Sequence, residues 1–331
     1  MSVTVVSGGF ADLADRWSEL CRATGAMPFS TPQFGEAWWS VFGESTEAEL
    51  ELLGLENGTG DLVALAPLKR GGAHWSFAGD HEVSDYLGPV AKAGREPQLV
   101  SAVLDRLESA DARSAEFRGI EPGTDWVQAF TAAAERGWTV DVAEEAVCPT
   151  IKLRGGWDDY LASLRSRDRR EVRRKLRPLR QLRGAVSFEA VETPAGVQQR
   201  MPEFIDMMAE SRGDKAVFLT DEMRVFFERL STSLSEAGWL RLYVMSVSGE
   251  AAAMVLCFVA RNQLLLYNSG YAPKFRDLSA GLASKVLCIR DAVERGMSSV
   301  NFLRGDEPYK YELGGNDAVV RLLRLRREGA A

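Results

Sequence analysis

The sequence predicts an α/β fold with mixed sheets in two tandem domains, on three observations. The chain has 331 residues, and domains average roughly 150 residues. Net charge is -14 over residues 1–150 and +7 over residues 151–331, an asymmetry typical of separate domains. Each half also contains a strand hairpin followed by a helix and a strand. We therefore predict domains at 1–150 and 151–331.

The composition is that of a folded globular protein. Hydrophobic residues make up 46% and charged residues 26%. The net charge of -7 disfavours a nucleic-acid binder over the whole chain. Four scattered cysteines without a Cys-x-x-Cys pair fit a reducing cytoplasm. No apolar run reaches the ~18 residues of a membrane span, and the first residues lack the pattern of a signal peptide. We expect a cytoplasmic location.

The first half predicts helices and strands in alternation. Helical spacing covers residues 11–24 and 34–42. Strands over 49–55 and 62–68 flank a turn at 57–60. A helix over 96–109, a strand over 114–119 and a helix over 125–136 follow, and Gly137 ends the last helix.

The second half shows the same order more clearly. Strands are expected over 240–247, 251–260 and 264–271, joined by short turns. An amphipathic helix over 280–295 ends before Gly296, which favours a left-handed helix stop. Strands over 299–303 and 318–325 complete the second domain.

Many common catalytic arrangements are absent from the sequence. His74 and His81 have no partners at zinc-ligand spacing, and we expect no metal site. No nucleophile elbow, Walker loop or dinucleotide fingerprint occurs. A Ser-His-Asp hydrolase is disfavoured because the second half contains no histidine.

Residues 267–282 predict a strand, a loop and the start of a helix. Ser279 is a good N-cap, and the small Ala280 and Gly281 allow a ligand to approach the first backbone N–H groups. Those groups and the helix dipole favour an anion such as a pyrophosphate. Arg276 and Lys274 add positive charge. An ordinary capped helix with small residues for close packing explains the segment equally well.

Residues 301–315 form a dense polar and aromatic loop after a strand. Its groups could act as acid, base or oxyanion partner. From the residues alone, an ion-paired structural loop is favoured, with Arg304 bound to Asp306 and Lys310 bound to Glu312.

Residues 165–183 form a basic stretch with a local net charge of +8. A sparse apolar stripe predicts a helix that Pro178 kinks or ends. Such a helix could bind phosphates, including RNA. We favour a solvated helix that faces the acidic first half, because the stretch has no aromatic residues for base stacking.

These segments together resemble the GNAT acyltransferases. The order of strands, loop, helix and Tyr-containing loop is similar to the GNAT fold. Residues 301–310 resemble the signature of the CelD-type branch, which is related to the FemABX peptidyltransferases, and residues 34–43, 84–86 and 157–160 are also similar to that branch. The resemblance covers nearly the whole chain. It implies tandem GNAT-like domains with a cleft between them, the first domain being degenerate.

The resemblance also implies site residues. In GNAT enzymes the start of the helix holds the coenzyme A pyrophosphate, and that role maps to Arg276 and Ser279–Leu282. Ser279 and Gly281 occupy the two glycine-like positions of the common loop pattern, and Lys310 matches the aromatic-Lys motif of the FemABX relatives. The residues assigned to the donor are Arg276, Ser279, Ala280, Gly281 and Leu282.

The implied reaction is direct attack of a neutral amine on an acyl carbonyl. Asp306 or Glu307 is the expected base and Tyr309 or Tyr311 the expected acid, while Lys310 stabilises negative charge. The acceptor is expected to meet Asp85, Asn268 and Tyr271.

The favoured function is an N-acyltransferase that uses acetyl-CoA or another acyl-CoA. One alternative is a FemABX-like transferase that uses aminoacyl-tRNA, and another is a non-catalytic ligand-binding module. The acceptor is expected to be an amine on a small molecule, a saccharide or a peptide. The CelD-type resemblance associates the chain with exopolysaccharide biosynthesis.

Overall fold

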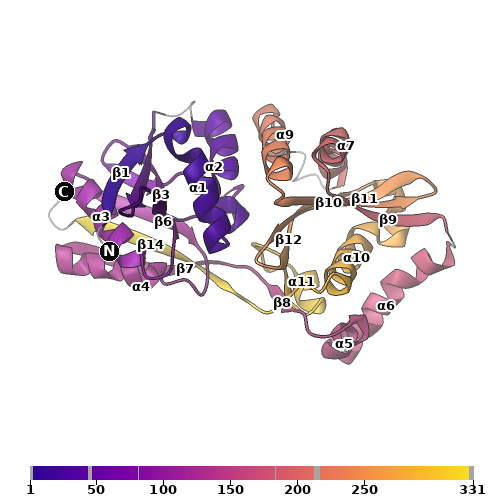
Figure 1. The fold of residues 1–331 in the computed structure, drawn as a ribbon. Coiled ribbons are helices and arrows are strands. Elements are labelled where there is room, and N and C mark those ends of the chain that lie inside the picture. Colours follow the sequence, from indigo (N-terminus) through magenta and orange to yellow (C-terminus); the bar gives the residue numbers. More distant parts are fainter. Residues whose placement is uncertain (1–2, 44–46, 81, 183, 212–216, 328–331) are drawn as a thin grey trace. The chain divides into compact units, whose positions relative to one another are not determined.

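The computed structural model describes residues 3–43, 47–80, 82–182, 184–211 and 217–327 (Figure 1). The chain divides into two compact units. The first comprises Met1–Ala146 with Val319–Ala331, and the second comprises Val147–Ala318. Each unit is a sheet covered by helices, so the predicted α/β class and the arrangement in two domains are confirmed. The cleft between the domains stays a prediction.

The first unit is built on a sheet of order β1-β2-β3-β4-β6-β14-β7, with β5 beside β3. Its strands are β1 (Thr4–Gly8), β2 (Glu49–Glu56), β3 (Leu62–Gly71), β4 (His74–Phe77), β5 (Val90–Ala91), β6 (Ser114–Ile120), β7 (Trp138–Val147) and β14 (Val319–Arg327). Its helices are α1 (Phe10–Thr24), η1 (Pro28–Ser30), α2 (Pro32–Trp38), η2 (Trp39–Gly43), α3 (Glu96–Ser109), α4 (Trp126–Thr131) and η3 (Ala132–Arg136).

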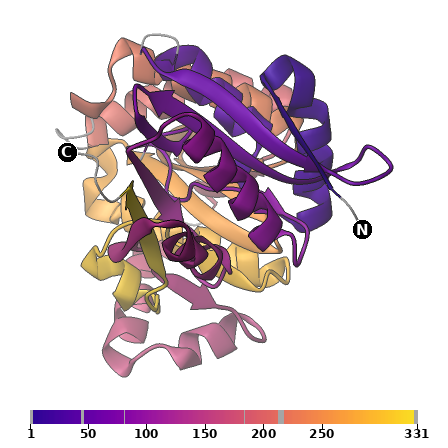
Figure 2. The ribbon, with the colours of Figure 1, turned by 90° about the vertical axis from the view of Figure 1, so that its left-hand side faces the viewer.

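Helices cover both faces of the first sheet (Figure 2). Leu52 of β2 belongs to the apolar cluster of Leu13 and Trp17 on α1. Its neighbour Leu53 belongs to the cluster of Leu99 on α3. Successive side chains of a strand point to opposite faces. The near-continuous apolar run of β2 therefore reflects burial on both sides.

The second unit is built on a sheet of order β8-β13-β12-β11-β10-β9. Its strands are β8 (Thr150–Lys152), β9 (Val186–Val191), β10 (Leu240–Val247), β11 (Glu250–Ala260), β12 (Gln263–Tyr271) and β13 (Ser299–Asn301). Its helices are α5 (Trp157–Ser163), α6 (Ser166–Gln181), α7 (Pro194–Ser211), α9 (Asp221–Glu236), η4 (Pro273–Leu278), α10 (Ala280–Glu294) and α11 (Pro308–Glu312).

In the second unit, α7 and α9 lie on one face of the sheet, and α10 lies on the other with α5 and α6 (Figure 1). Val286 and Ile289 of α10 are fully buried in one cluster with Val255 of β11 and Leu176 of α6. β12 and β13 are parallel and are joined by α10, whereas the other pairs in this sheet are antiparallel. A crossover helix is the usual way to connect parallel neighbours.

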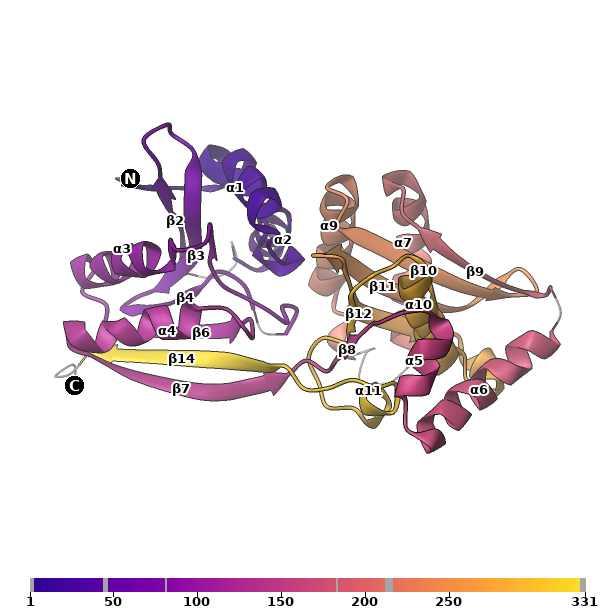
Figure 3. The same cartoon turned by 60° about the horizontal axis from the view of Figure 1, so that its bottom comes forward.

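The last strand belongs to the sheet of the first unit and not, as expected, to the second domain. Residues 318–325 were expected in the second domain, but β14 pairs antiparallel with β6 and lies between β6 and β7 (Figure 3). Leu323 and Leu325 are buried in the core of the first unit. The observed units therefore differ from the expected division at residue 150 in two ways. The first unit ends at residue 146, and the chain from residue 319 onward belongs to it again.

Several element ends also differ from the expectations. The helix expected over 34–42 is α2 followed by a π-helical turn, and the one over 125–136 is α4 followed by a 3-10 turn. α6 runs through Pro178 and ends at Gln181. The strand expected over 299–303 stops at Asn301. Gly137 and Gly296 adopt the left-handed conformation expected at helix ends, with φ of 80° and 68°.

Candidate active site in the second unit

Two parallel strands part in the middle of the second sheet. β13 pairs with β12 only from Gln263 to Leu265, opposite Ser299 to Asn301. β12 continues to Tyr271 without this partner, while the chain after Asn301 turns into the polar loop. The backbone therefore leaves the far half of β12 open on the side where β13 ends.

A β-bulge at Tyr267 decides which side chains of β12 face α10. Leu266 pairs with Cys257, but Asn268 pairs with Leu256, so Tyr267 is an inserted residue. Before the bulge, Leu264 and Leu266 face the cluster under α10. After the bulge, the following two residues on that face are Ser269 and Tyr271, as their contacts with α10 show.

The predicted acceptor residues Asn268 and Tyr271 therefore lie on opposite faces of the sheet. Asn268 shares the face of Tyr267, whose ring contacts Phe227 of α9. Tyr271 lies under Gly281 of α10, where an added Cβ would lie 3.1 Å from the ring. The structure separates these two residues, and only Tyr271 lies beside the start of α10.

Ser279 starts α10 in a different way from the expected cap. It occupies the N-cap position, but its side chain makes no cap hydrogen bond. Instead its Oγ accepts a hydrogen bond from Nζ of Lys175 on α6, at 2.9 Å. Its φ of 53° is in the left-handed region that glycine adopts freely. The side-chain cap expected from the sequence is wrong, because this backbone turns the hydroxyl away.

The small residues at the start of α10 have packing roles as well. Ala280 is fully buried, and Gly281 lies against the ring of Tyr271. The first backbone N–H groups of a helix have no intrahelical acceptors, so this end carries partial positive charge. Arg276 is exposed on η4 just before it, and Lys175 adds a second cation from α6. The residues present thus fit an anionic group.

The loop after β13 is organised by Lys310, which is 2% exposed. Its ammonium donates hydrogen bonds to the carbonyl oxygens of Leu303, Arg304 and Gly305, at 3.1, 2.7 and 3.2 Å. It also forms an ion pair with Glu307 at 2.9 Å. The pair expected between Lys310 and Glu312 is wrong, because the loop folds back over the ammonium before α11 begins.

Gly305 must be glycine in this loop. Its φ is 119°, and an added Cβ would lie 2.4 Å from Oε2 of Glu307 and 3.0 Å from Nζ of Lys310. Glycine therefore allows the backbone to pass close to the ion pair.

The two predicted tyrosines have different surroundings. The ring of Tyr309 packs edge-on against Phe302 and lies 5.4 Å from Nζ of Lys285. Tyr311 is 37% exposed, and its hydroxyl donates a hydrogen bond to Asp317 at 2.8 Å. This hydrogen bond raises the pKa of Tyr311 to about 12. Asp306, between them and β13, is exposed.

Sequence reasoning missed Lys285, which lies in the same region. Its Nζ donates hydrogen bonds to Oγ of Ser269 on β12 at 2.9 Å and to the carbonyl oxygen of Gly281 at 3.0 Å. Burial lowers its pKa to about 8. Its position four residues after Gly281 and three before the buried Cys288 puts it on one helix stripe with them. This spacing was the signal in the sequence that could have identified Lys285.

Asp85 belongs to the first unit. It is half-buried between the buried Ser84 and Tyr86. Its predicted contact with the acceptor stays a prediction.

The corresponding parallel pair of the first unit lacks the features of an anion site. β4 and β6 are parallel, with α3 between them in sequence. The first turn of α3 contains Glu96, whose charge repels anions, and Pro97, which has no N–H.

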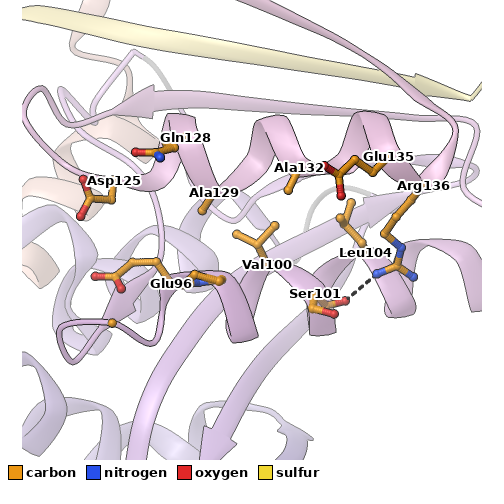
Figure 4. A pocket seen from close by; sticks show the side chains of 12 residues that line it. Glu96, Val100, Ser101, Leu104, Asp125, Gln128, Ala129, Ala132, Glu135 and Arg136 are labelled. Atoms are coloured by element: carbon orange, nitrogen blue, oxygen red, sulfur yellow. Dashed lines mark hydrogen bonds between the residues drawn. The ribbon is translucent and has the colours of Figure 1, made fainter.

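A groove of about 520 Å³ lies between α3 and α4 of the first unit (Figure 4). Its floor includes Val100 and Ala129, and its rim includes the carboxylates of Glu96 and Asp125. Arg136 at one end is held by Asp105 and Glu108. None of the predicted site residues lines this groove.

Within the described ranges, no three His, Cys, Asp or Glu side chains are grouped so as to hold a metal ion. His81 lies outside those ranges. The described helices include none with the length and apolar character needed to cross a membrane.

Comparison with known families and structures bears on the family of the second unit and on the fold. Residues 166–311 match the family described as "Acetyltransferase (GNAT) domain", which confirms the GNAT resemblance for the second unit. A search of the curated proteins gives no match.

Three solved structures show the same fold over nearly the whole chain. The structure of FemX has a TM-score of 0.64 at 13% identity, covering 98% of this chain and 97% of that one. A C-terminal domain described as part of a lysylphosphatidylglycerol synthetase from Agrobacterium fabrum has a TM-score of 0.58 at 14% identity, covering 96% and 92%. A tandem GNAT protein from the clavulanic acid biosynthesis pathway has a TM-score of 0.50 at 12% identity, covering 100% of both chains.

Proposed function

We propose that the protein is an N-acyltransferase that moves an acyl group, with acetyl the first candidate, from acyl-CoA to an amine. The observation that carries the proposal is the parting of β12 and β13 beside the positively charged start of α10. The unpaired part of β12 would bind the acyl arm of the acyl-CoA donor. The positively charged start of α10 would bind the phosphates of the same molecule.

The donor phosphates would bind at the start of α10. Backbone N–H groups of Ala280, Gly281 and Leu282 supply hydrogen bonds, and Arg276 supplies charge. Lys175 is an addition to the predicted set, since it already reaches Ser279 from α6. The left-handed conformation of Ser279 supports this reading, because the corresponding position in the common GNAT loop is glycine-like.

The catalytic groups would come from the loop after β13. Of the predicted residues, Asp306 is exposed and Tyr309 is partly exposed, so both are accessible to a substrate. Lys310 and Glu307 are bound to one another, and Tyr311 is bound to Asp317. We therefore favour Tyr309 over Tyr311 as a proton donor to the leaving group. We assign Lys310 the role of stabilising the conformation of the loop after β13.

A second candidate function is transfer from aminoacyl-tRNA, and the surface of α6 favours it. The buried face of α6 contains Val172, Leu176 and Leu179. Its exposed arginines are Arg167, Arg170, Arg173, Arg174, Arg177 and Arg180. They form a cationic surface on the helix whose Lys175 contacts the start of α10, so an RNA backbone bound there would lie near the donor site.

The acceptor in either case is an amine, on a small molecule, a saccharide or a peptide. We extend the proposal to a cytoplasmic reaction that belongs to exopolysaccharide biosynthesis, on the CelD-type resemblance of residues 301–310. A binding module without turnover is the remaining alternative.

The test measures thermal unfolding with acetyl-CoA, longer acyl-CoAs and desulfo-CoA. A ligand at 100 times its Kd should stabilise the protein by about 2.7 kcal/mol. Arg276→Ala and Lys175→Ala should each weaken the donor at least tenfold, whereas Arg290→Ala, exposed further along α10, should leave the shift unchanged.

The second arm of the test titrates aminoacyl-tRNA at several salt concentrations. A shift with acyl-CoA that both variants reduce supports the acyl-CoA donor. Binding of tRNA alone, with a steep loss as salt rises and a further loss in Arg170→Ser/Arg173→Ser, would favour the second candidate. Binding of neither donor would contradict both.

A further inference from the structure

Lys285 is enclosed by three elements of the candidate site. Its own helix contributes the carbonyl oxygen of Gly281, β12 contributes Oγ of Ser269, and α11 contributes the ring of Tyr309. Ser269 lies beyond Leu265, the last residue of β12 that pairs with β13. The ammonium group therefore lies where the two strands have parted, on the α10 face of β12.

The charged and titratable groups around Lys285 do not neutralise it. Cys288 of α10 and Cys257 of β11 lie below it, and both thiols are fully buried. Glu307 and Lys310 face it from the loop after β13, but these two residues form an ion pair with each other. Lys285 is thus a part-buried residue whose ammonium is held by a hydroxyl, a carbonyl and an aromatic ring.

Desolvation disfavours the charged form of an amine, and it lowers the pKa of Lys285 from 10.5 to about 8. A substantial neutral fraction is then present at mildly alkaline pH. The hydroxyl of Ser269 can accept a hydrogen bond from the ammonium or donate one to the neutral amine. Both protonation states of Lys285 can therefore keep the same position.

We propose, building on the proposed function, that Lys285 is the general base of the acyl transfer. The acceptor nitrogen forms a bond to the acyl carbonyl carbon and loses a proton to the neutral Nζ of Lys285. The bond from that carbon to the donor sulfur then breaks, the sulfur takes the proton of the Tyr309 hydroxyl, and the protonated Lys285 gives its proton back to Tyr309. The products are the amide and the free thiol, and Lys285 is neutral again.

Lys285 suits this task better than the carboxylates predicted from the sequence. Solvated carboxylates are much weaker bases than amines. A general base is most effective when its pKa lies near the working pH. Asp306 is exposed to water, and Glu307 is paired with Lys310. Neither has the desolvated surroundings that Lys285 has.

The first measurement needs no substrate. The chain has eight lysines, so an NMR titration of lysine side chains labelled with ¹³C can follow each Cε signal, with Lys285→Met assigning one of them. We expect Lys285 to titrate near pH 8, well below the ordinary lysine value of about 10.4. A Lys285 signal that titrates at the ordinary lysine value of about 10.4 would overturn the inference, whatever activity is found.

The second measurement follows acetyl transfer from acetyl-CoA to glucosamine and to a lysine-containing peptide. In the wild type at saturating acceptor, kcat should rise up to tenfold per pH unit until about pH 8 and then level off, because the neutral form of Lys285 is the active base. Lys285→Met and Lys285→Arg should each lower kcat at least 100-fold, with the acetyl-CoA Kd changed less than threefold. Lys152→Met is the matched control and should leave kcat unchanged.

If both Lys285 variants kept the wild-type kcat for acetyl transfer, the inference would be overturned, even if Lys285 titrated near pH 8. A purely structural role would instead weaken acetyl-CoA binding and kcat together, and it would leave the pH profile unchanged. A wild-type protein that acetylates no amine would contradict the proposed function, and the titration then distinguishes this failure from a failure of the inference.

Discussion

The ammonium of Lys310 has more hydrogen-bond acceptors around it than it has N–H groups. Its three N–H groups serve three backbone carbonyl oxygens and the carboxylate of Glu307, and its side chain is almost fully buried. A buried ammonium with all its donors engaged holds the loop between β13 and α11 in one conformation. The residue that the FemABX resemblance singles out therefore has a structural part in this chain, beside any part in the reaction.

Removing this ammonium should destabilise the second unit. Lys310→Met leaves three carbonyl oxygens and the half-exposed carboxylate of Glu307 without their donor, and leaving a buried acceptor unsatisfied costs about 1–3 kcal/mol. Urea unfolding monitored by circular dichroism measures the free energy of unfolding. Lys152→Met, exposed on β8, is the control and should change it by less than ~0.5 kcal/mol. Equal stability of the two variants would contradict the structural role of Lys310.

The two lysines show what the sequence can predict at single residues. Lys310 was found because the residues around it resemble a known motif, but its partners come from loop geometry that no pattern encodes. Lys285 was missed because a lysine on an amphipathic helix ordinarily faces water. Only the parted strands and the position of Tyr309 make that side of α10 an interior surface.

At the scale of the element, the start of α10 stores strain in Ser279. A non-glycine residue in the left-handed region costs about 1 kcal/mol or more, and Ser279 adopts φ of 53° there. The hydrogen bond from Lys175 offsets part of this cost. Glycine would remove the strain but would also remove the hydroxyl.

A matched pair of substitutions separates the two effects. Ser279→Gly and Ser279→Ala both lose the hydrogen bond to Lys175, but only alanine keeps the strain. Ser279→Gly should therefore be about 1 kcal/mol more stable than Ser279→Ala, as measured by urea unfolding. If the alanine variant were as stable as the glycine variant, this backbone conformation would not hold in solution.

The bulge in β12 decides which of the two predicted acceptor residues on this strand faces α10. The sequence predicts the strand, because apolar residues run from Leu264 to Leu266 and the turn signals flank it. One inserted residue at Tyr267 exchanges the faces of all later residues. That insertion depends on the pairing with β11, which the pattern of one strand cannot show. Regular alternation from Leu264 and Leu266 would turn Asn268 toward α10 and Tyr271 away from it, and the bulge reverses the two.

At the scale of the whole molecule, β14 explains part of the charge asymmetry of the sequence. Arg324 of β14 forms ion pairs with Glu116 and Asp141, and Arg321 pairs with Glu144. The strand brings basic residues from the end of the chain into the acidic first unit. The sequence contains the charge imbalance and predicts the strand, but it does not predict that the strand joins the sheet of the first unit. Pairing between residues some 200 positions apart leaves no local signal.

The most direct test of the account is amide hydrogen exchange with and without acetyl-CoA. We predict slower exchange in peptides that cover residues 276–284, where the first N–H groups of α10 would bind the donor phosphates. Peptides over residues 94–100, at the start of α3, provide an internal control and should not change, because Glu96 and Pro97 disfavour an anion there. Protection at α3, or saturating acetyl-CoA without protection at α10, would contradict the assignment of the donor site.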